Sequence, residues 1–297
     1  MSEKNRIVKA YSSSSMVKRF VTGILAAVGF STLIFVPHRI PVFAIGIAVV
    51  SILAAKELYS AVRRQGGEPT NILGYLACVV FQFAAWTHNG TRFVPYLPMP
   101  LVLLVLACLL VELVKQRPKP ILNIGATLLG AIYVGWLCSY LTLLHGANSA
   151  YIHPPIRGTT TGQWIVMFVA TTTWISDTAA LFMGKLLGKN KLAPSISPNK
   201  TWEGSAGGIV VSLLTGGVLI AVLKMPIIPG LGLAALCAVS GQLGDLCESA
   251  MKRDLGLKDF GDMLPGMGGV LDRIDSILFA APLAYYFIVL LNLAKLG

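Results

Sequence analysis

Residues 249–276 read SAMKRDLGLKDFGDMLPGMGGVLDRIDS and join two long apolar runs. Acids, bases and glycines are concentrated in this segment, whereas 55% of the chain is hydrophobic and only 12% is charged. Asp245, Asp272 and Asp275 lie at or inside the ends of the apolar runs, where an ionised group is costly and usually functional. The alternative, a solvated loop whose charges serve solubility, explains these positions less well. The segment therefore predicts a functional site where two helices meet.

The spacing of the polar residues indicates the chemistry of this site. A helix that continues through Arg253 places four polar residues on one face, at i, i+3, i+4 and i+7: Asp245, Glu248, Ser249 and Lys252. In the following run, Asp272, Asp275 and Ser276 share a face in the same way. Carboxylates suit Mg²⁺, while basic side chains and glycine-rich backbone suit phosphate oxygens. The pattern therefore favours phosphate chemistry with a bound metal.

The composition predicts the fold class. The mean hydropathy of +0.72 is too high for a soluble domain, and apolar runs of membrane-spanning length recur along the 297 residues. We expect an all-α, polytopic integral membrane protein without a separate soluble domain. About nine transmembrane helices are predicted, at residues 20–37, 40–58, 71–86, 97–114, 121–144, 164–184, 202–224, 227–247 and 271–294.

The net charge of +11 is spread unevenly over the two sides of these helices. Most Lys and Arg residues lie in the amino-terminal tail and in alternate loops, whereas the opposite loops hold only Arg39, Arg92, Arg157 and Lys224. The positive-inside rule therefore predicts a cytoplasmic amino terminus. Because the basic residues are interleaved with membrane spans, we expect the lipid bilayer as a partner and no nucleic-acid surface.

The chain divides into three predicted parts. Residues 1–19 form a basic cytoplasmic tail, and residues 20–163 form about five helices with few ionisable groups. Lys56, Glu57 and Glu112 close two of these helices and are interpreted as interfacial side chains that reach toward water. Residues 164–297 form the predicted catalytic region, with cytoplasmic loops at 185–201 and 248–270.

A second polar region precedes the seventh predicted helix. Asp177 shares a helix face with Thr173 inside an apolar run, which indicates either a cation partner or an interhelical hydrogen-bonding cluster. The loop that follows carries lysines and hydroxyl side chains up to a helix start near Thr201, an arrangement that favours anion binding. Gly204 and Gly208 are predicted to permit close helix packing.

At this point the motifs resemble a known family, the phosphatidate cytidylyltransferases or CDP-diacylglycerol synthases. The pattern S-x-x-K-R-x4-K-D followed by P-G-x-G-G-x-x-D-R-x-D is carried by Ser249, Lys252, Arg253, Lys258, Asp259, Pro265, Gly266, Gly268, Gly269, Asp272, Arg273 and Asp275. Ser176-Asp177, residues 195–204 and Gly244-Asp245 add to the likeness. The resemblance is specific over residues 170–276, while the earlier spans agree only as membrane helices.

The resemblance implies an enzyme of phospholipid biosynthesis that converts CTP and phosphatidic acid into CDP-diacylglycerol and pyrophosphate. It implies a location in the cell (inner) membrane, with an active site that faces the cytoplasm and opens sideways to the lipid. Dependence on Mg²⁺ comes with it, and a second cation such as K⁺ and a homodimer are left open. Two residues depart from the family pattern, Met267 where histidine is usual and Asn199 where a lysine is usual.

The expected roles follow from the residues and the resemblance together. The residues expected to carry catalysis are Asp245, Asp272, Asp275, Lys252 and Arg253. The metal ligands implied are Asp245 and Asp272, with Asp177 beside a second cation. The residues expected to bind substrate are Lys200, Ser197, Asn199, Thr201, Ser249, Lys258, Asp259, Gly266, Gly268, Gly269 and Arg273.

Two other functions stay open on the sequence alone. One is CTP-dependent chemistry on a different lipid, as in a prenol kinase or a CDP-archaeol-type synthase. The other is a cation-coupled transporter, which would place its charged cluster near the bilayer centre, whereas most charges here lie at helix ends and in loops.

Overall fold

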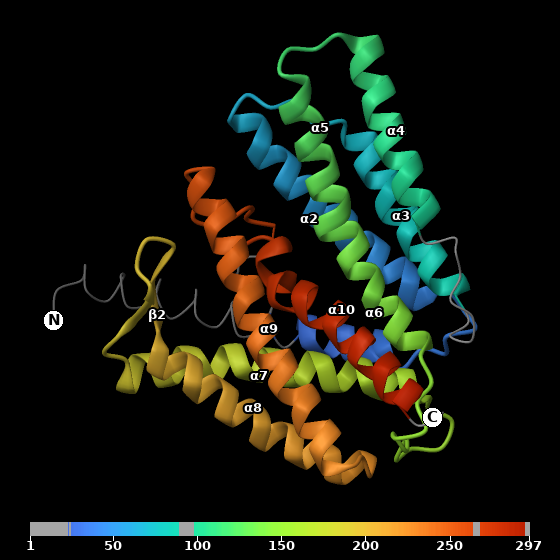
Figure 1. Ribbon diagram of the computed structural model, residues 1–297, viewed down its shortest axis with the longest axis vertical. Coiled ribbons are helices and arrows are strands. Elements are labelled where there is room, and N and C mark those ends of the chain that lie inside the picture. Colours follow the sequence, from blue (N-terminus) through green and yellow to red (C-terminus); the bar gives the residue numbers. More distant parts are fainter. Residues whose placement is uncertain (1–22, 24, 89–97, 264–267, 295–297) are drawn as a thin grey trace, which may run out of the picture.

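The computed structural model describes residue 23 and residues 25–88, 98–263 and 268–294. Its helices, with one π-helical segment named η1, are α2 (Val42–Arg64), α3 (Asn71–Thr87), α4 (Pro98–Lys115), α5 (Pro120–Leu129), η1 (Gly130–Trp136), α6 (Leu137–Gly146), α7 (Thr161–Leu187), α8 (Trp202–Leu223), α9 (Ile227–Asp254) and α10 (Leu271–Ala294). Two short strands, β1 (Lys191–Ala193) and β2 (Ser197–Thr201), pair in antiparallel fashion. The predicted helical architecture is confirmed (Figure 1).

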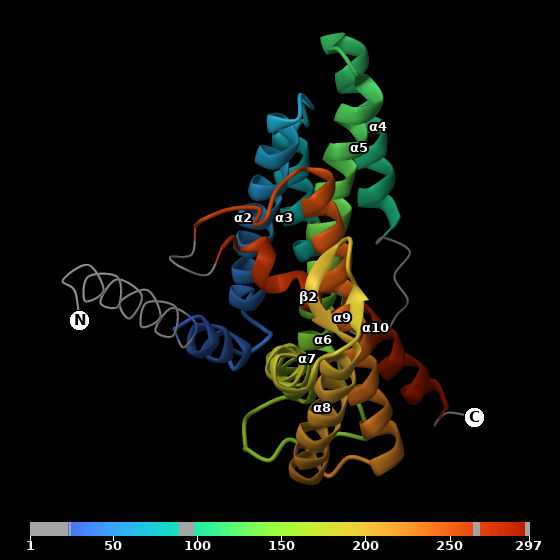
Figure 2. The same cartoon turned by 90° about the vertical axis from the view of Figure 1, so that its left-hand side faces the viewer.

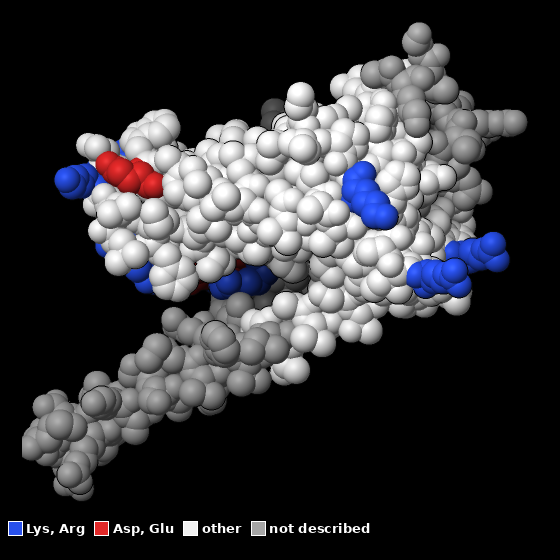
Figure 3. Space-filling model, turned by 90° about the horizontal axis from the view of Figure 1, so that it is seen from below, with Lys and Arg blue, Asp and Glu red and all other residues white. Residues whose placement is uncertain are grey.

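Within the described ranges, six helices are long and apolar enough to cross a membrane: α2, the continuous span Pro120–Gly146, α7, α8, α9 and α10. Leu25–Ile34 and α3 are shorter apolar helices. The protein is therefore a multi-pass membrane protein, while the predicted total of nine crossings and the cytoplasmic amino terminus stay predictions. The tail at residues 1–19 lies outside the described residues. Seen from below, the molecule presents wide uncharged surface between sparse basic side chains, as expected for contact with lipid (Figure 3).

The helices form two groups with α9 and α10 between them. Helices α2 to α6 lie on one side and α7 and α8 on the other, and the view turned by 90° shows the same separation (Figures 1 and 2). One core joins both groups, since Ile47 of α2, Leu141 of α6, Val169 of α7, Leu233 of α9 and Ala281 of α10 belong to the same buried cluster. Helix α10 contacts α2 and α6 of the first group and α7 of the second, whereas α9 packs against α7, α8 and α10.

Glycines set the spacing of the helices that carry the polar residues. A Cβ added at Gly204 would lie 2.7 Å from the carbonyl oxygen of Ala180, and one at Gly208 would lie 2.7 Å from that of Ser176. The predicted close packing of these two glycines is therefore confirmed, against α7. A Cβ at Gly244 would lie 2.6 Å from the carbonyl oxygen of Asp275, so α9 and α10 also approach closely where their acidic side chains lie.

The loop predicted at residues 185–201 contains the β-hairpin. Its strands have no alternating apolar pattern, and β2 reads Ser-Pro-Asn-Lys-Thr, so no strand was predicted there. Glu203, in the first turn of α8, holds the segment that precedes β1. Its carboxylate accepts hydrogen bonds from the backbone N–H groups of Lys189 at 3.1 Å and Asn190 at 3.2 Å. Thr201 caps α8 by accepting from the N–H of Gly204 at 3.1 Å, which confirms the predicted helix start.

Candidate active site

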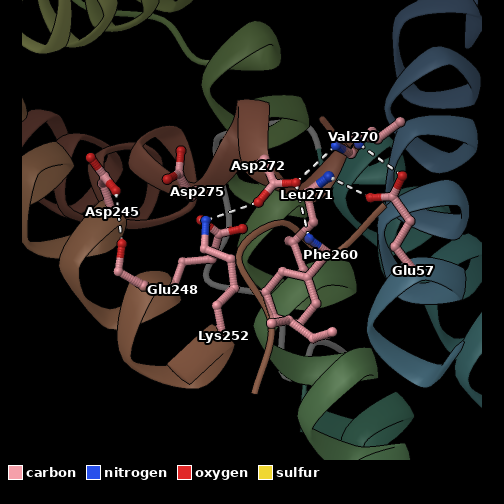
Figure 4. Close-up of polar contacts among 12 residues, drawn as sticks. Glu57, Asp245, Glu248, Lys252, Phe260, Val270, Leu271, Asp272 and Asp275 are labelled. Atoms are coloured by element: carbon pink, nitrogen blue, oxygen red, sulfur yellow. Dashed lines mark hydrogen bonds and ion pairs between the residues drawn. The ribbon is translucent and has the colours of Figure 1, made fainter. Parts of the chain in front are cut away.

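Three carboxylates converge where α9 and α10 pack together. One oxygen each from Asp245 and Glu248 of α9 and Asp275 of α10 lie within 4.8 Å of one another (Figure 4). Asp245 and Glu248 are one helical turn apart, and the close approach of the helices at Gly244 brings Asp275 to them. We call these three residues the carboxylate triad.

The triad fits a divalent cation. The Glu248 side chain has no exposed surface, and its Oε1 atom is buried without a hydrogen-bond partner among the described residues. Carboxylates this close, two of them buried, repel one another unless positive charge lies between or beside them. Two lysines supply part of that charge, because Lys200 Nζ lies 2.7 Å from Asp245 Oδ2 and Lys252 Nζ lies 2.8 Å from Glu248 Oε2. The oxygen-only donor set with one free buried oxygen suits Mg²⁺.

Asp272 was predicted as a metal ligand, but it lies outside the converging set. Its Oδ1 accepts from Lys252 Nζ at 2.9 Å, and its Oδ2 accepts from the backbone N–H groups of Gly269 at 2.8 Å and Phe260 at 3.2 Å (Figure 4). Both oxygens are thus used to hold the loop between α9 and α10. Its role as a ligand stays a prediction, and the geometry offers Glu248 in its place.

A cavity of about 570 Å³ lies beside the triad. It is lined by the β1–β2 hairpin, the end of α7, the start of α8 and the middle of α9. Its polar lining consists of Asp177, Lys185, Lys191, Ser197, Asn199, Lys200, Thr201, Ser205, Gln242 and Asp245. The cavity therefore brings together the two polar regions of the sequence, and Asp245 belongs to both the cavity wall and the triad. Asp177, predicted beside a second cation, shares that wall.

The remaining predicted residues lie at the end of α9, in the loop that follows it and at the start of α10. Arg253 donates from Nε to the carbonyl oxygen of Ile196 at 3.1 Å and from Nη1 to that of Leu257 at 2.9 Å, so it joins the hairpin turn to the loop after α9. Ser249 donates to Asp245 Oδ1 at 3.4 Å. Lys258, Asp259 and Arg273 are exposed on the loop side, and Gly268 adopts a left-handed backbone with φ +85°. Gly266 and Met267 lie outside the described residues.

Two acidic residues were missed as site residues. Glu248 carried a usable signal, since it shares a helix face with Asp245. The sequence around Glu57 has little that indicates a site. The interpretation of Glu57 as a side chain that reaches toward water is wrong, because it is 6% exposed and accepts hydrogen bonds from the N–H groups of Val270 and Leu271, both at 2.9 Å. Glu112 is also buried, at 6% exposure, with Arg117 and Asn123 as partners, so the same interpretation is wrong for it. Lys56 is exposed as expected.

The chain is similar to known proteins over almost its whole length. The model of a family described as the cytidylyltransferase family matches residues 17–291. A phosphatidate cytidylyltransferase of Bacillus subtilis (strain 168) is 34% identical over 93% of this chain and 99% of its own length. One from Synechocystis is 36% identical over 84% of this chain and 89% of its own, and one from Brucella melitensis is 44% identical over 53% of this chain and 55% of its own.

Proposed function

The chain belongs to the cytidylyltransferase family, and on that premise we propose that its site transfers the cytidylyl group of CTP to phosphatidate. The products are CDP-diacylglycerol and pyrophosphate, which makes the protein a transferase of phospholipid biosynthesis in a membrane. The observation that carries this proposal is the likeness to a phosphatidate cytidylyltransferase across 93% of the chain at 34% identity.

Catalysis of this reaction requires mainly that the two substrates are positioned and that the negative charge of their phosphates is neutralised. An oxygen of the phosphatidate monoester attacks the α-phosphorus of CTP, the bond from that phosphorus to the bridging oxygen breaks, and its electron pair leaves with pyrophosphate. A phosphomonoester has a second pKa of about 6 and is therefore largely dianionic at neutral pH, so no general base is required. Methionine at position 267, where the family pattern has histidine, is compatible with this chemistry.

The residues of the triad are proposed to hold Mg²⁺, with Asp177 available to a second cation. When bound, the ion supplies positive charge that polarises the phosphoryl group and offsets the charge of the leaving pyrophosphate. Lys200 and Asn199 project into the cavity from β2 and are proposed to bind phosphate oxygens there. Lys252 links the triad to the following loop and keeps Glu248 in place through its ion pair at 2.8 Å. The protein thus orients both phosphates before bond formation.

The cavity is proposed to face the cytoplasm and the inner leaflet together. The basic ends of α7 and α9 and the lysines of the hairpin lie on the side assigned to the cytoplasm by the positive-inside rule. Leu181 lines the cavity and is 56% exposed, so the wall on the α7 side is apolar at its rim. Such a rim allows the acyl chains of phosphatidate to stay in the bilayer while the headgroup enters.

The test is pyrophosphate release from CTP by the purified protein in detergent, with Mg²⁺, in the presence and absence of phosphatidate. We expect release that depends on phosphatidate and on the divalent ion, with CDP-diacylglycerol as the lipid product. Absence of release with phosphatidate rejects the proposal. Release with a prenol or an archaeal-type lipid alone assigns the site to that lipid.

A further inference from the structure

We propose that Glu57 of α2 is a positioning residue for the transfer reaction, which acts through the loop before α10 and through Asp272 and Lys252 on the carboxylate triad. This inference rests on the proposed function. It extends the site to a helix outside residues 164–297, the part in which the sequence placed all of the chemistry.

The Glu57 carboxylate holds the first turn of α10. Its Oε1 accepts from the N–H of Val270 at 2.9 Å and its Oε2 accepts from the N–H of Leu271 at 2.9 Å (Figure 4). The first N–H groups of a helix have no partner within the helix, and the positive end of the helix dipole favours a carboxylate there. Because each oxygen holds a different N–H, both the position and the orientation of the helix start are fixed.

The backbone closes tightly around this carboxylate. A Cβ at Gly261 would lie 2.5 Å from Glu57 Oε1, and one at Gly269 would lie 2.4 Å from Oε2. Side chains at these two positions would therefore collide with the carboxylate. Gln65, the residue that follows α2, donates from Nε2 to the carbonyl oxygen of Leu255 at 2.9 Å. Glu57 and Gln65 together therefore contact the loop between α9 and α10 near its first residue, in its middle and near its last residue.

A continuous series of contacts leads from Glu57 to the triad. Gly269, which packs on Glu57, donates its N–H to Asp272 Oδ2 at 2.8 Å. Asp272 Oδ1 accepts from Lys252 Nζ at 2.9 Å, and the same Nζ lies 2.8 Å from Oε2 of Glu248. Loss of the Glu57 contacts frees the start of α10 and moves the partner of Lys252. Glu57 and Asp272 are hereafter called the loop-bracing pair.

Two variants separate this role from a purely stabilising one. Glu57→Gln keeps the size of the side chain but replaces one accepting oxygen with an N–H₂ group that faces a backbone N–H. Glu57→Asp keeps the charge but is one methylene shorter, so it cannot reach both N–H groups at the same distance. The matched control is Glu112→Gln, because Glu112 is equally buried at 6% and its partners are Arg117 of the α4–α5 connection and Asn123 of α5.

The first measurement is turnover per folded molecule, with phosphatidate-dependent pyrophosphate release normalised to monodisperse protein. We expect Glu57→Gln to lower kcat by about a hundredfold with a nearly unchanged KM, since displacement of catalytic groups by about 1 Å has that effect. Glu57→Asp should recover part of this loss. Glu112→Gln should lower the melting temperature without a comparable loss of kcat.

The second measurement does not depend on activity. Amide hydrogen exchange in the peptides that cover residues 255–271 should become faster in Glu57→Gln, with or without Mg²⁺, and stay unchanged in Glu112→Gln. In the double variant with Asp272→Asn, the loss of kcat should be close to that of Asp272→Asn alone, because both changes act on one series of contacts.

The outcomes are distinguishable from a failure of the proposed function. An inactive wild-type protein rejects the proposed function, and the exchange data then still report whether Glu57 fixes the loop. An active wild-type protein with wild-type kcat in Glu57→Gln overturns the inference. Equal losses of kcat in Glu57→Gln and Glu112→Gln overturn it as well, since a general loss of stability then explains both.

Discussion

Two groups of acidic side chains lie next to each other at the junction of α9 and α10, and they differ in what surrounds their oxygens. In the loop-bracing pair, Glu57 and Asp272, all four oxygens accept hydrogen bonds from N–H groups or a lysine. In the carboxylate triad, the oxygens face one another, and Oε1 of Glu248 has no partner among the described residues. A buried carboxylate whose oxygens all accept hydrogen bonds holds backbone in place, whereas converging carboxylates that keep a buried oxygen without a partner are suited to a cation. This difference is why we propose a structural role for the loop-bracing pair and metal binding for the triad.

Removal of a carboxylate from the triad should have the greatest effect. We expect Asp245→Asn and Glu248→Gln each to lower kcat by on the order of 10³-fold, because a bound divalent ion contributes several kcal/mol to phosphoryl transfer. Both variants should also need more Mg²⁺ for half-maximal activity. Titration of pyrophosphate release with Mg²⁺ measures this, and Mg²⁺ binding by calorimetry gives a reading independent of turnover. Full activity in either variant removes the triad as the metal site.

Asp272→Asn should act differently from the triad variants. Its amide keeps one acceptor but places an N–H₂ group against a backbone N–H or against Lys252, so the loop loses order rather than a ligand. We expect kcat to fall by about a hundredfold, as for displaced catalytic groups, with an unchanged Mg²⁺ requirement. If the Mg²⁺ requirement changes in Asp272→Asn and stays unchanged in Glu248→Gln, then Asp272 is the metal ligand and Glu248 holds the structure in place.

Much of the site's arrangement could be predicted from the sequence because it depends on the spacing of residues along single helices. Asp245, Glu248 and Lys252 share a face of one helix by their i, i+3 and i+7 spacing, and the structure keeps them together on α9. The start of α8 at Thr201 and the close packing at Gly204 and Gly208 also follow from local patterns. The motif likeness covered residues 170–276, and the family match at residues 17–291 extends it to the amino-terminal helices.

The features of the site that could not be predicted depend on contacts between segments that are far apart in the sequence. Glu57 meets Val270 across 213 residues, and nothing in the neighbourhood of either residue signals the other. Asp272 and Asp275 look equivalent at the start of an apolar run, yet Asp275 meets the carboxylates of α9, whereas Asp272 binds Lys252 and the backbone of the preceding loop. The hairpin was missed because its strands lack alternation and are held by Glu203, a residue that follows them.

The cavity lysine should have a smaller effect than either acidic group. Lys200 Nζ lies 2.7 Å from Asp245 Oδ2, and Lys200 lines the cavity in which a phosphate would compete with this acid for it. We expect Lys200→Gln to lower kcat/KM by about thirtyfold, since a hydrogen bond to a charged group is worth about 2 kcal/mol. Steady-state kinetics with each substrate varied in turn measures the loss, and Lys200→Arg should retain more activity.

The control for Lys200 is Lys56→Gln, which removes an exposed lysine of α2 that lies outside the lining of the cavity beside the triad. A loss of equal size in both variants would mean that net positive charge near the membrane matters rather than the contact at the cavity. A loss in Lys200→Gln that disappears at saturating CTP but not at saturating phosphatidate would assign the lysine to the nucleotide.

The smallest change tests whether the triad depends on helix spacing. In Gly244→Ala the new methyl group would lie 2.6 Å from the carbonyl oxygen of Asp275, so α9 and α10 must separate. We expect a destabilisation of about 1–3 kcal/mol, typical of overpacking, and a loss of kcat of about tenfold as Asp275 moves away from Asp245. The matched control is Gly217→Ala in α8, where nothing lies within 4 Å of the added carbon, and there the helix should gain about 0.5–1 kcal/mol. Thermal melting in detergent and turnover at saturating substrates measure both. A Gly244→Ala enzyme with normal kcat would show that the triad tolerates a wider gap between its helices, and the close approach would then serve packing alone.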